Sequence, residues 1–178
     1  MYVLDLDDSI FDTRWFKEFF LDVLGNTWRN KAMLMEMMDL SKEYNDGIFD
    51  FKKWLSLCWI SENEFELIWQ RAHSFVYDDF IEFASRNKNN IIILTYGDRY
   101  FQEKKIKRSW IERYINSYYI TKEKNKKNDL INIYNKCKEK LVYIDDRVFV
   151  KQNDFDFDID IFRFSRTNNA QLTNLAYI

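Results

Sequence analysis

The segment MYVLDLDDSIFDT, residues 1–13, starts with a short apolar run and continues into a cluster of acids. The apolar run predicts a buried strand. The polar residues that come after it are Asp5, Asp7, Asp8 and Ser9. Carboxylates at the carboxyl end of a parallel strand lie where open α/β sheets bind their ligands. Such a cluster is costly without a cation, and Mg²⁺, which prefers carboxylate and water ligands, is the natural candidate.

Three later stretches of the chain also place polar residues beside predicted elements. They are an apolar run 91–94 that ends in Thr95, a lysine cluster 122–127 before a helical pattern, and an apolar run 141–144 that ends in Asp145-Asp146. In chain order, the sequence therefore offers a strand with Asp-x-Asp, a strand with Thr, a lysine, and a strand with Asp-Asp.

This order resembles the four motifs of the haloacid dehalogenase (HAD) superfamily of phosphohydrolases, and the resemblance covers most of the chain. The first motif is usually Asp-x-Asp-x-Thr-Leu, and residues 5–10 read Asp-Leu-Asp-Asp-Ser-Ile. The counterparts of the other three motifs are Thr95, then Lys126 or Lys127, then Asp145-Asp146.

The sequence departs from the family pattern at two places. Ser9 stands where the first motif usually has threonine, which keeps the hydroxyl group. Fourth motifs often add an acid a few residues later, whereas residues 147–150 here read Arg-Val-Phe-Val. In the fourth motif, the metal site is therefore expected to depend on Asp145 and Asp146.

The resemblance implies an α/β fold with a Rossmann-like parallel-sheet core in three layers (α/β/α) and an inserted helical cap. The core is expected at residues 1–13 and 78–178. Residues 14–77 carry helical patterns near 14–25, 28–44, 49–59 and 61–75, which matches a cap of the C1 type. The helix at 61–75 begins with the capping-box sequence Ser61-x-x-Glu64.

Further elements are predicted inside the core. A return helix is expected from residue 77 to 85, a helix at about 99–110 and a strand near 118–121. Residues 154–161 alternate strictly between aspartate and an apolar side chain, which predicts a half-buried strand with a solvated acidic face.

The resemblance implies a Mg²⁺-dependent phosphatase that works through an aspartyl-phosphate intermediate. Asp5 would be the nucleophile and Asp7 the general acid and base. Thr95 and Lys127 would hold the phosphoryl oxygens. We prefer Lys127 because it lies three and four residues before the first apolar positions of the next helix, with Lys126 as the alternative.

The same resemblance implies the remaining site residues. The metal would be held by Asp5, by the backbone carbonyl of Asp7 and by the Asp145-Asp146 pair. We prefer Asp146 as the direct ligand, because the superfamily commonly has Gly-Asp at that place. The residues expected to bind the substrate are Ser9, Tyr96, Gly97 and Lys126.

Several functions fit this set of residues. Asp7 favours phosphoryl transfer over dehalogenation, because haloalkanoate dehalogenases lack this second aspartate. The expected substrate is a small phosphorylated metabolite, such as a sugar phosphate or a nucleoside monophosphate. Alternatives are a phosphomutase of the same fold, a nucleic-acid end phosphatase that uses the lysine runs, a non-catalytic phospho-ligand-binding protein, and a doubly wound domain with another ligand.

Composition narrows the class of protein. The chain has 178 residues with a net charge of −2, which argues against a dedicated nucleic-acid binder. His73 is the only histidine, which excludes a metal site built from several histidines. Cys58 and Cys137 are the only cysteines and fit a reducing compartment, so a cytoplasmic location is expected. No apolar run approaches the ~18 residues of a membrane helix. The first strand is expected to begin at the start of the sequence, which leaves no room for a signal peptide before it. The sequence does not indicate an oligomeric state.

Overall fold

The computed structural model describes residues 1–166 and 171–177, and the chain divides into two compact units. Unit 1 comprises Met1–Asp12, Val76–Tyr96 and Ile111–Ile178. Unit 2 comprises Thr13–Phe75 and Gly97–Trp110. The chain therefore leaves and re-enters unit 1 twice.

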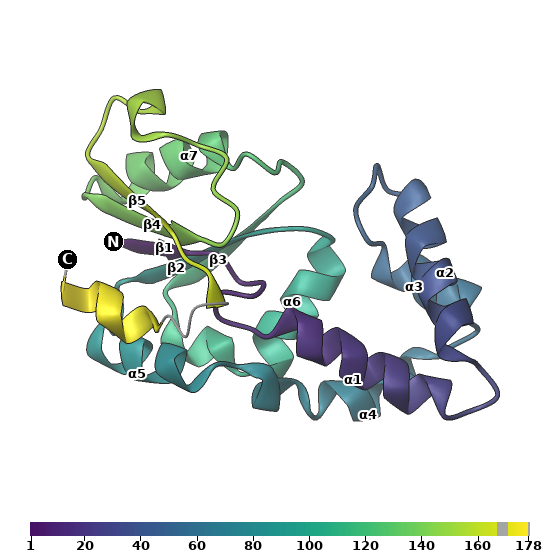
Figure 1. Cartoon of the computed structure of the whole chain (residues 1–178). Helices are drawn as coiled ribbons and strands as arrows, with labels where there is room; N and C mark the ends of the chain where they lie inside the picture. Colours follow the sequence, from purple (N-terminus) through teal and green to yellow (C-terminus); the bar gives the residue numbers. More distant parts are fainter. Residues whose placement is uncertain (167–170, 178) are drawn as a thin grey trace. The chain divides into compact units, whose positions relative to one another are not determined.

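Unit 1 is built on a five-stranded parallel sheet with the strand order β3-β2-β1-β4-β5 (Figure 1). Its strands are β1 (Tyr2–Leu4), β2 (Ile91–Tyr96), β3 (Ser117–Thr121), β4 (Leu141–Asp145) and β5 (Ile159–Arg163). In the central strand β1, Leu4 lies opposite Ile93 of β2 and Ile144 of β4. The carboxyl ends of these three strands therefore meet at one edge of the sheet.

Helices cover both faces of this sheet (Figure 1). On one face, α7 (Lys127–Cys137) buries Leu130 and Ile133 against strand residues such as Val3. On the other face lie α5 (Asp78–Arg86) and the 3₁₀ helix η5 (Leu172–Tyr177), with Phe83 of α5 against the Tyr2 ring at 5.0 Å. The shorter 3₁₀ helices of this unit are η2 (Ile111–Tyr114) and η3 (Gln152–Asp154). The predicted three-layer α/β/α core is confirmed.

Unit 2 is helical. Its helices are α1 (Thr13–Gly25), α2 (Lys31–Glu43), α3 (Phe51–Leu57), α4 (Glu62–Trp69), η1 (Ala72–Phe75) and α6 (Arg99–Arg108). Large aromatic side chains fill its interior, among them Phe16, Phe20, Phe51, Trp54, Phe65 and Trp69. The predicted capping box at the start of α4 is present, with Ser61 and Glu64 satisfying each other's backbone N–H groups.

Helix α6 packs with unit 2, although the sequence placed its residues in the core domain. The Phe101 ring lies 4.9 Å from Phe51 and 5.6 Å from Trp69, measured between ring centroids. At the other end of α6, the Arg108 guanidinium is 2.5 Å from the Glu66 carboxylate. A helical pattern specifies that a face must be buried but not which partner buries it.

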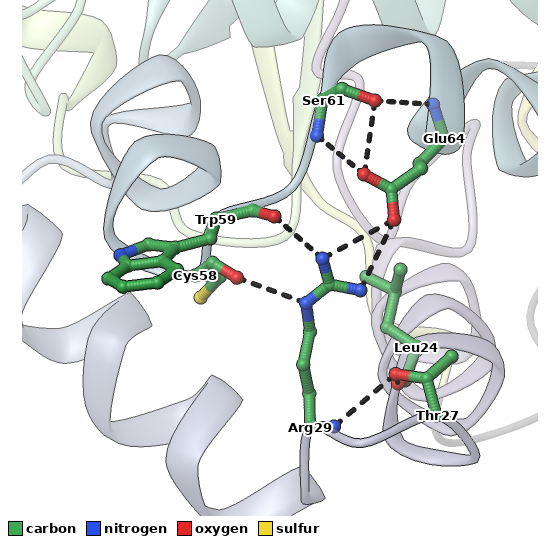
Figure 2. A network of polar contacts seen from close by, with 7 residues as sticks. All are labelled: Leu24, Thr27, Arg29, Cys58, Trp59, Ser61 and Glu64. Carbon is green, nitrogen blue, oxygen red and sulfur yellow. Dashed lines mark hydrogen bonds and ion pairs between the residues drawn. The ribbon is translucent and has the colours of Figure 1, made fainter.

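A buried arginine ties three segments of unit 2 together (Figure 2). The Arg29 guanidinium donates to the carbonyl oxygens of Cys58 at 3.0 Å and Trp59 at 2.6 Å, and it lies 3.3 Å from the Glu64 carboxylate. These carbonyls follow the end of α3, where helical carbonyls have no intrahelical partner. Arg29 therefore joins the end of α3 to the start of α4.

The predicted strand at 154–161 is wrong over its first half. Gln152–Asp154 forms η3, and β5 begins only at Ile159, opposite Leu141 of β4. Phe155 and Phe157 are nevertheless packed against the core, while Asp154, Asp156 and Asp158 are exposed. A strand requires a hydrogen-bonded neighbour strand as well as alternating burial. Since β4 begins at Leu141, opposite Ile159, it does not pair with residues 154–157.

The helices are short, since α1 and α2 have 13 residues each. Among the described residues, no helix has the length and the apolar character needed to cross a membrane.

Candidate active site

The predicted motif residues gather at the carboxyl edge of the sheet in unit 1. Asp5 directly follows β1, Thr95 is the last residue but one of β2, and Asp145 is the last residue of β4. The Asp5 backbone N–H donates to the Ile144 carbonyl at 2.9 Å, which fixes the end of β1 against β4. The parallel pairing of β1 with β2 and β4 thus brings together, at one edge of the sheet, residues far apart in sequence.

The lysine that contacts the carboxylates is Lys126, whereas the sequence pattern favours Lys127. The Lys126 ammonium lies 2.5 Å from Asp5 Oδ1 and 2.7 Å from Asp145 Oδ2. All three side chains are buried. Lys127 is only half-buried and begins α7.

The register of α7 explains this correction. Lys126 has a left-handed backbone with a φ of 51° and immediately precedes the helix. It lies four residues before Leu130, which is one of the fully buried residues of α7. Lys127 lies four residues before Ile131, which is only half-buried. Leu130, rather than Ile131, marks the buried face of α7, and Lys126 lies on that face.

Asp145 is engaged at both carboxylate oxygens. Oδ2 accepts hydrogen bonds from Lys126 and from the Tyr143 hydroxyl, and Oδ1 accepts from the Arg147 backbone N–H at 2.7 Å. Tyr143 was not predicted, although residues two apart on a strand share a face and could have revealed it. Asp146, by contrast, is partly exposed, and its Oδ2 lies 3.3 Å from the Arg147 guanidinium.

Three carboxylates are close enough to share a cation. Asp5, Asp145 and Asp146 each offer an oxygen, and these oxygens lie within 4.8 Å of one another. The carboxylate of Asp7 is not part of this group. Asp7 is predicted to contribute through its backbone carbonyl instead. Carboxylate oxygens are the ligands that Mg²⁺ prefers.

The protonation equilibria also fit a cation site. The pKa of Asp5 is raised to about 7, mainly by burial and also by the charges of Asp145 and Asp7, while Lys126 opposes the rise without cancelling it. Burial also raises the pKa of Asp146. Burial lowers the pKa of Lys126, but Asp5 and Asp145 outweigh this and leave it raised. One lysine therefore does not neutralise the cluster, and a divalent cation would.

Two buried hydroxyl groups have no hydrogen-bond partner among the described residues. They are Thr95 Oγ1 and Ser9 Oγ, on side chains that are 0% and 1% exposed. An unsatisfied buried hydroxyl costs about 1–3 kcal/mol, so native structures rarely keep one without a reason. Both residues were predicted to contact the substrate, and a ligand oxygen would satisfy them.

The acids of the first motif lie on a tight loop, residues 5–12, which we call the aspartate loop. Asp8 adopts a φ of 57°, which is uncommon for a residue with a side chain. Its N–H donates to the Phe11 carbonyl at 2.8 Å, and the Ile10 carbonyl accepts from the Tyr77 N–H at 3.0 Å. Asp7 is half-buried, and its charge reaches Asp5.

Tyr96 and Gly97 extend from the end of β2. Tyr96 is half-buried, and the Lys124 ammonium lies 5.8 Å from its ring centroid. Gly97 has a φ of 148°, and a Cβ there would lie only 2.8 Å from the Gln102 amide nitrogen. The backbone conformation therefore favours a glycine at this position.

No protein-family model and no curated protein matches the sequence. Solved structures do match the fold. A haloacid dehalogenase-like hydrolase from Burkholderia xenovorans LB400 has a TM-score of 0.56 at 16% identity, over 82% of this chain and 71% of that one. The HAD-hydrolase YfnB from Bacillus subtilis, bound to magnesium, has a TM-score of 0.51 at 14% identity, over 82% and 77%.

A third similar structure is the L-2-haloacid dehalogenase from Xanthobacter autotrophicus with chloropropionic acid covalently bound. Its TM-score is 0.53 at 12% identity, over 99% of this chain and 86% of that one. The similar structures thus include both hydrolases and dehalogenases. With its parallel sheet, its strand order and these similarities, the chain has the fold of the haloacid dehalogenase superfamily.

Proposed function

We propose that this protein is a Mg²⁺-dependent phosphatase that hydrolyses a small phosphomonoester through an aspartyl-phosphate intermediate. The observation that carries the proposal is the group of three carboxylates, Asp5, Asp145 and Asp146, whose oxygens lie within 4.8 Å of one another although Lys126 pairs with only two of them. A site that collects this much negative charge is suited to a divalent cation, and a divalent cation is suited to an anionic phosphoryl group.

The proposed chemistry assigns one task to each side chain. Asp5 would attack phosphorus through the carboxylate oxygen that does not face Lys126, forming an aspartyl-phosphate while the P–O bond to the leaving group breaks. Asp7 would give its proton to the leaving oxygen and later take a proton from the water that cleaves the intermediate. Lys126 and the Thr95 hydroxyl would donate hydrogen bonds to the phosphoryl oxygens.

The metal would be held by Asp5, by Asp146 and by the backbone carbonyl of Asp7. When bound, Mg²⁺ supplies Lewis-acid stabilisation of the charge on the transferring phosphoryl group. Asp145 has both oxygens engaged by protein donors, so we assign it to holding Lys126 rather than the metal.

Dehalogenation is the second candidate, because a haloacid dehalogenase shares the fold. Asp7 disfavours it, since a halide leaving group requires no proton. The substrate class that we propose is a small phosphorylated metabolite, such as a sugar phosphate or a nucleoside monophosphate.

The test is hydrolysis of p-nitrophenyl phosphate and a panel of metabolite phosphates, with Mg²⁺ or with EDTA, by the wild type and by Asp5→Asn. We expect activity that requires both the metal and Asp5. Chloride release from 2-chloropropionate that is unaffected by EDTA, without phosphatase activity, would establish the dehalogenase instead.

A further inference from the structure

We propose that Arg166 is a positioning residue, which holds the aspartate loop in its active conformation from the far end of the chain. The catalytic part of this inference rests on the proposed phosphatase function. The geometric part, that Arg166 fixes the loop, does not.

The Arg166 guanidinium binds the backbone of the loop directly. Its Nε and Nη2 donate to the Ser9 carbonyl at 3.2 and 2.5 Å. Two donors from one rigid fork constrain the direction of the carbonyl more strongly than a single donor. The carbonyl joins Ser9 to the rest of the loop, so its orientation influences the backbone from Asp8 to Ile10.

The guanidinium is itself held from three sides. Its Nη1 lies 2.7 Å from Asp79 Oδ2, and Asp79 also accepts the Leu172 N–H at 2.6 Å. The guanidinium carbon stands 4.0 Å from the Tyr77 ring centroid and 4.7 Å from that of Phe164. An arginine that lies against two rings and is paired with a half-buried carboxylate has little freedom to move.

The approach of this segment to the site is also fixed by the sheet. The Phe164 N–H donates to the Asp145 carbonyl at 2.9 Å, so the chain after β5 runs beside the end of β4. Arg166 is thereby delivered to the same edge of the sheet as Asp5 and Lys126. None of these anchors involves a proposed ligand of the metal through its side chain.

The loop contains a left-handed backbone conformation, which aspartate adopts more readily than most residues but which is still uncommon. Asp8 has a φ of 57°, and residues in sparsely populated regions persist only where the surroundings enforce them. The Arg166 contact acts on the residue that follows Asp8. Without it, Asp7 would lose its fixed position relative to Asp5, and proton transfer to the leaving oxygen would become less efficient.

The experiment compares Arg166→Met and Arg166→Lys with the wild type. The readouts are hydrogen exchange of residues 5–12, and kcat and KM for p-nitrophenyl phosphate below the melting temperature. In Arg166→Met we expect faster exchange of the loop amides and a kcat lower by about 10–100-fold, with KM nearly unchanged. Arg166→Lys keeps the charge beside Asp79 but not the fork, so it should fold well and recover part of kcat.

Arg86→Met is the matched control, because Arg86 forms an exposed ion pair with Glu82 on α5. It should change neither readout. Unchanged loop exchange in both Arg166 variants would overturn the inference, and so would faster exchange with an unchanged kcat. If the wild type lacks phosphatase activity, the proposed function fails, and hydrogen exchange alone then decides whether Arg166 holds the loop.

Discussion

At the scale of single residues, adjacent lysines of the chain have different surroundings. Lys126 is buried between Asp5 and Asp145, whereas Lys127 is half-buried at the start of α7. The pair offers a comparison in which charge and size are the same and only position differs.

We expect Lys126→Met to lower kcat/KM for the phosphate substrate by at least about 100-fold, because a donor to the transferring phosphoryl group is lost. Lys127→Met should stay within about 2-fold of the wild type, since a partly exposed charge contributes little. Steady-state kinetics on folded protein, with folding checked by circular dichroism, would measure both. Equal losses in the two variants would contradict the assignment of Lys126.

Asp5 makes stability depend on pH in the metal-free protein. Burial raises its pKa from 3.8 to about 7, so between these values the folded state holds a proton that the unfolded state has released. The stabilisation linked to that proton is complete below pH 3.8 and is lost as the pH rises through about 7. The Asp5 contribution to the slope is at most about 1.4 kcal/mol per pH unit.

We therefore expect the wild type to lose stability relative to Asp5→Asn as the pH rises from 4 to 7, so that the difference between their free energies of unfolding depends on pH. Urea denaturation in EDTA at several pH values would measure this difference. A difference that is independent of pH would show that Asp5 has an ordinary pKa in the folded protein.

At the scale of helices and strands, part of the structure follows from the sequence. The strands β1, β2 and β4 are predictable because buried parallel strands appear as continuous apolar runs. The acids and the threonine at their ends follow from the same runs. The choice between Lys126 and Lys127 does not follow from the sequence, because helix periodicity alone does not decide which of two adjacent residues faces inward.

Other features had no usable signal in the sequence. Arg29 and Arg166 donate mainly to backbone carbonyls, which every residue has and which therefore leave no pattern in the sequence. The partner of α6 has no signal in the sequence either, since a helical pattern specifies that a face is buried but not which element buries it. Contacts of this kind depend on the tertiary fold, and only a structure reveals them.

The Arg29 network gives a prediction for the helices of unit 2. Arg29→Met would leave the Cys58 and Trp59 carbonyls without their donor, and we expect a loss of about 1–3 kcal/mol in the free energy of unfolding. Arg99→Met, which removes an exposed ion pair with Glu103 on α6, should cost less than about 0.5 kcal/mol. Chemical denaturation would measure both, and equal effects would show that the Arg29 network adds nothing beyond a surface ion pair.

At the scale of the whole molecule, the site is assembled from segments far apart in the chain. Asp5, Thr95, Lys126 and Asp146 all belong to unit 1, which is itself built from three stretches of sequence. A ligand that contacts several of these segments binds only when they are folded together. Binding therefore stabilises the folded unit through mass action.

Mg²⁺ at about 100 times its dissociation constant should add about 2.7 kcal/mol to the free energy of unfolding. For a chain of this size that corresponds to a rise in Tm of about 5–10 °C. We expect Asp146→Asn to abolish the rise, because it removes a proposed metal ligand. Asp145→Asn should lower the starting Tm but keep most of the rise, because both Asp145 oxygens bind protein donors.

Differential scanning fluorimetry with Mg²⁺, compared with NaCl at equal ionic strength, separates binding from general screening of charge. A rise that survives in Asp146→Asn but disappears in Asp145→Asn would exchange the roles of the two residues: Asp145 would then bind the metal, and its contact with Lys126 would have to break when the cation enters. An equal rise in Tm with NaCl alone would rule out a specific Mg²⁺ site. Loss of the rise in both variants would mean that the metal draws on both carboxylates, with Lys126 then held by Asp5 alone.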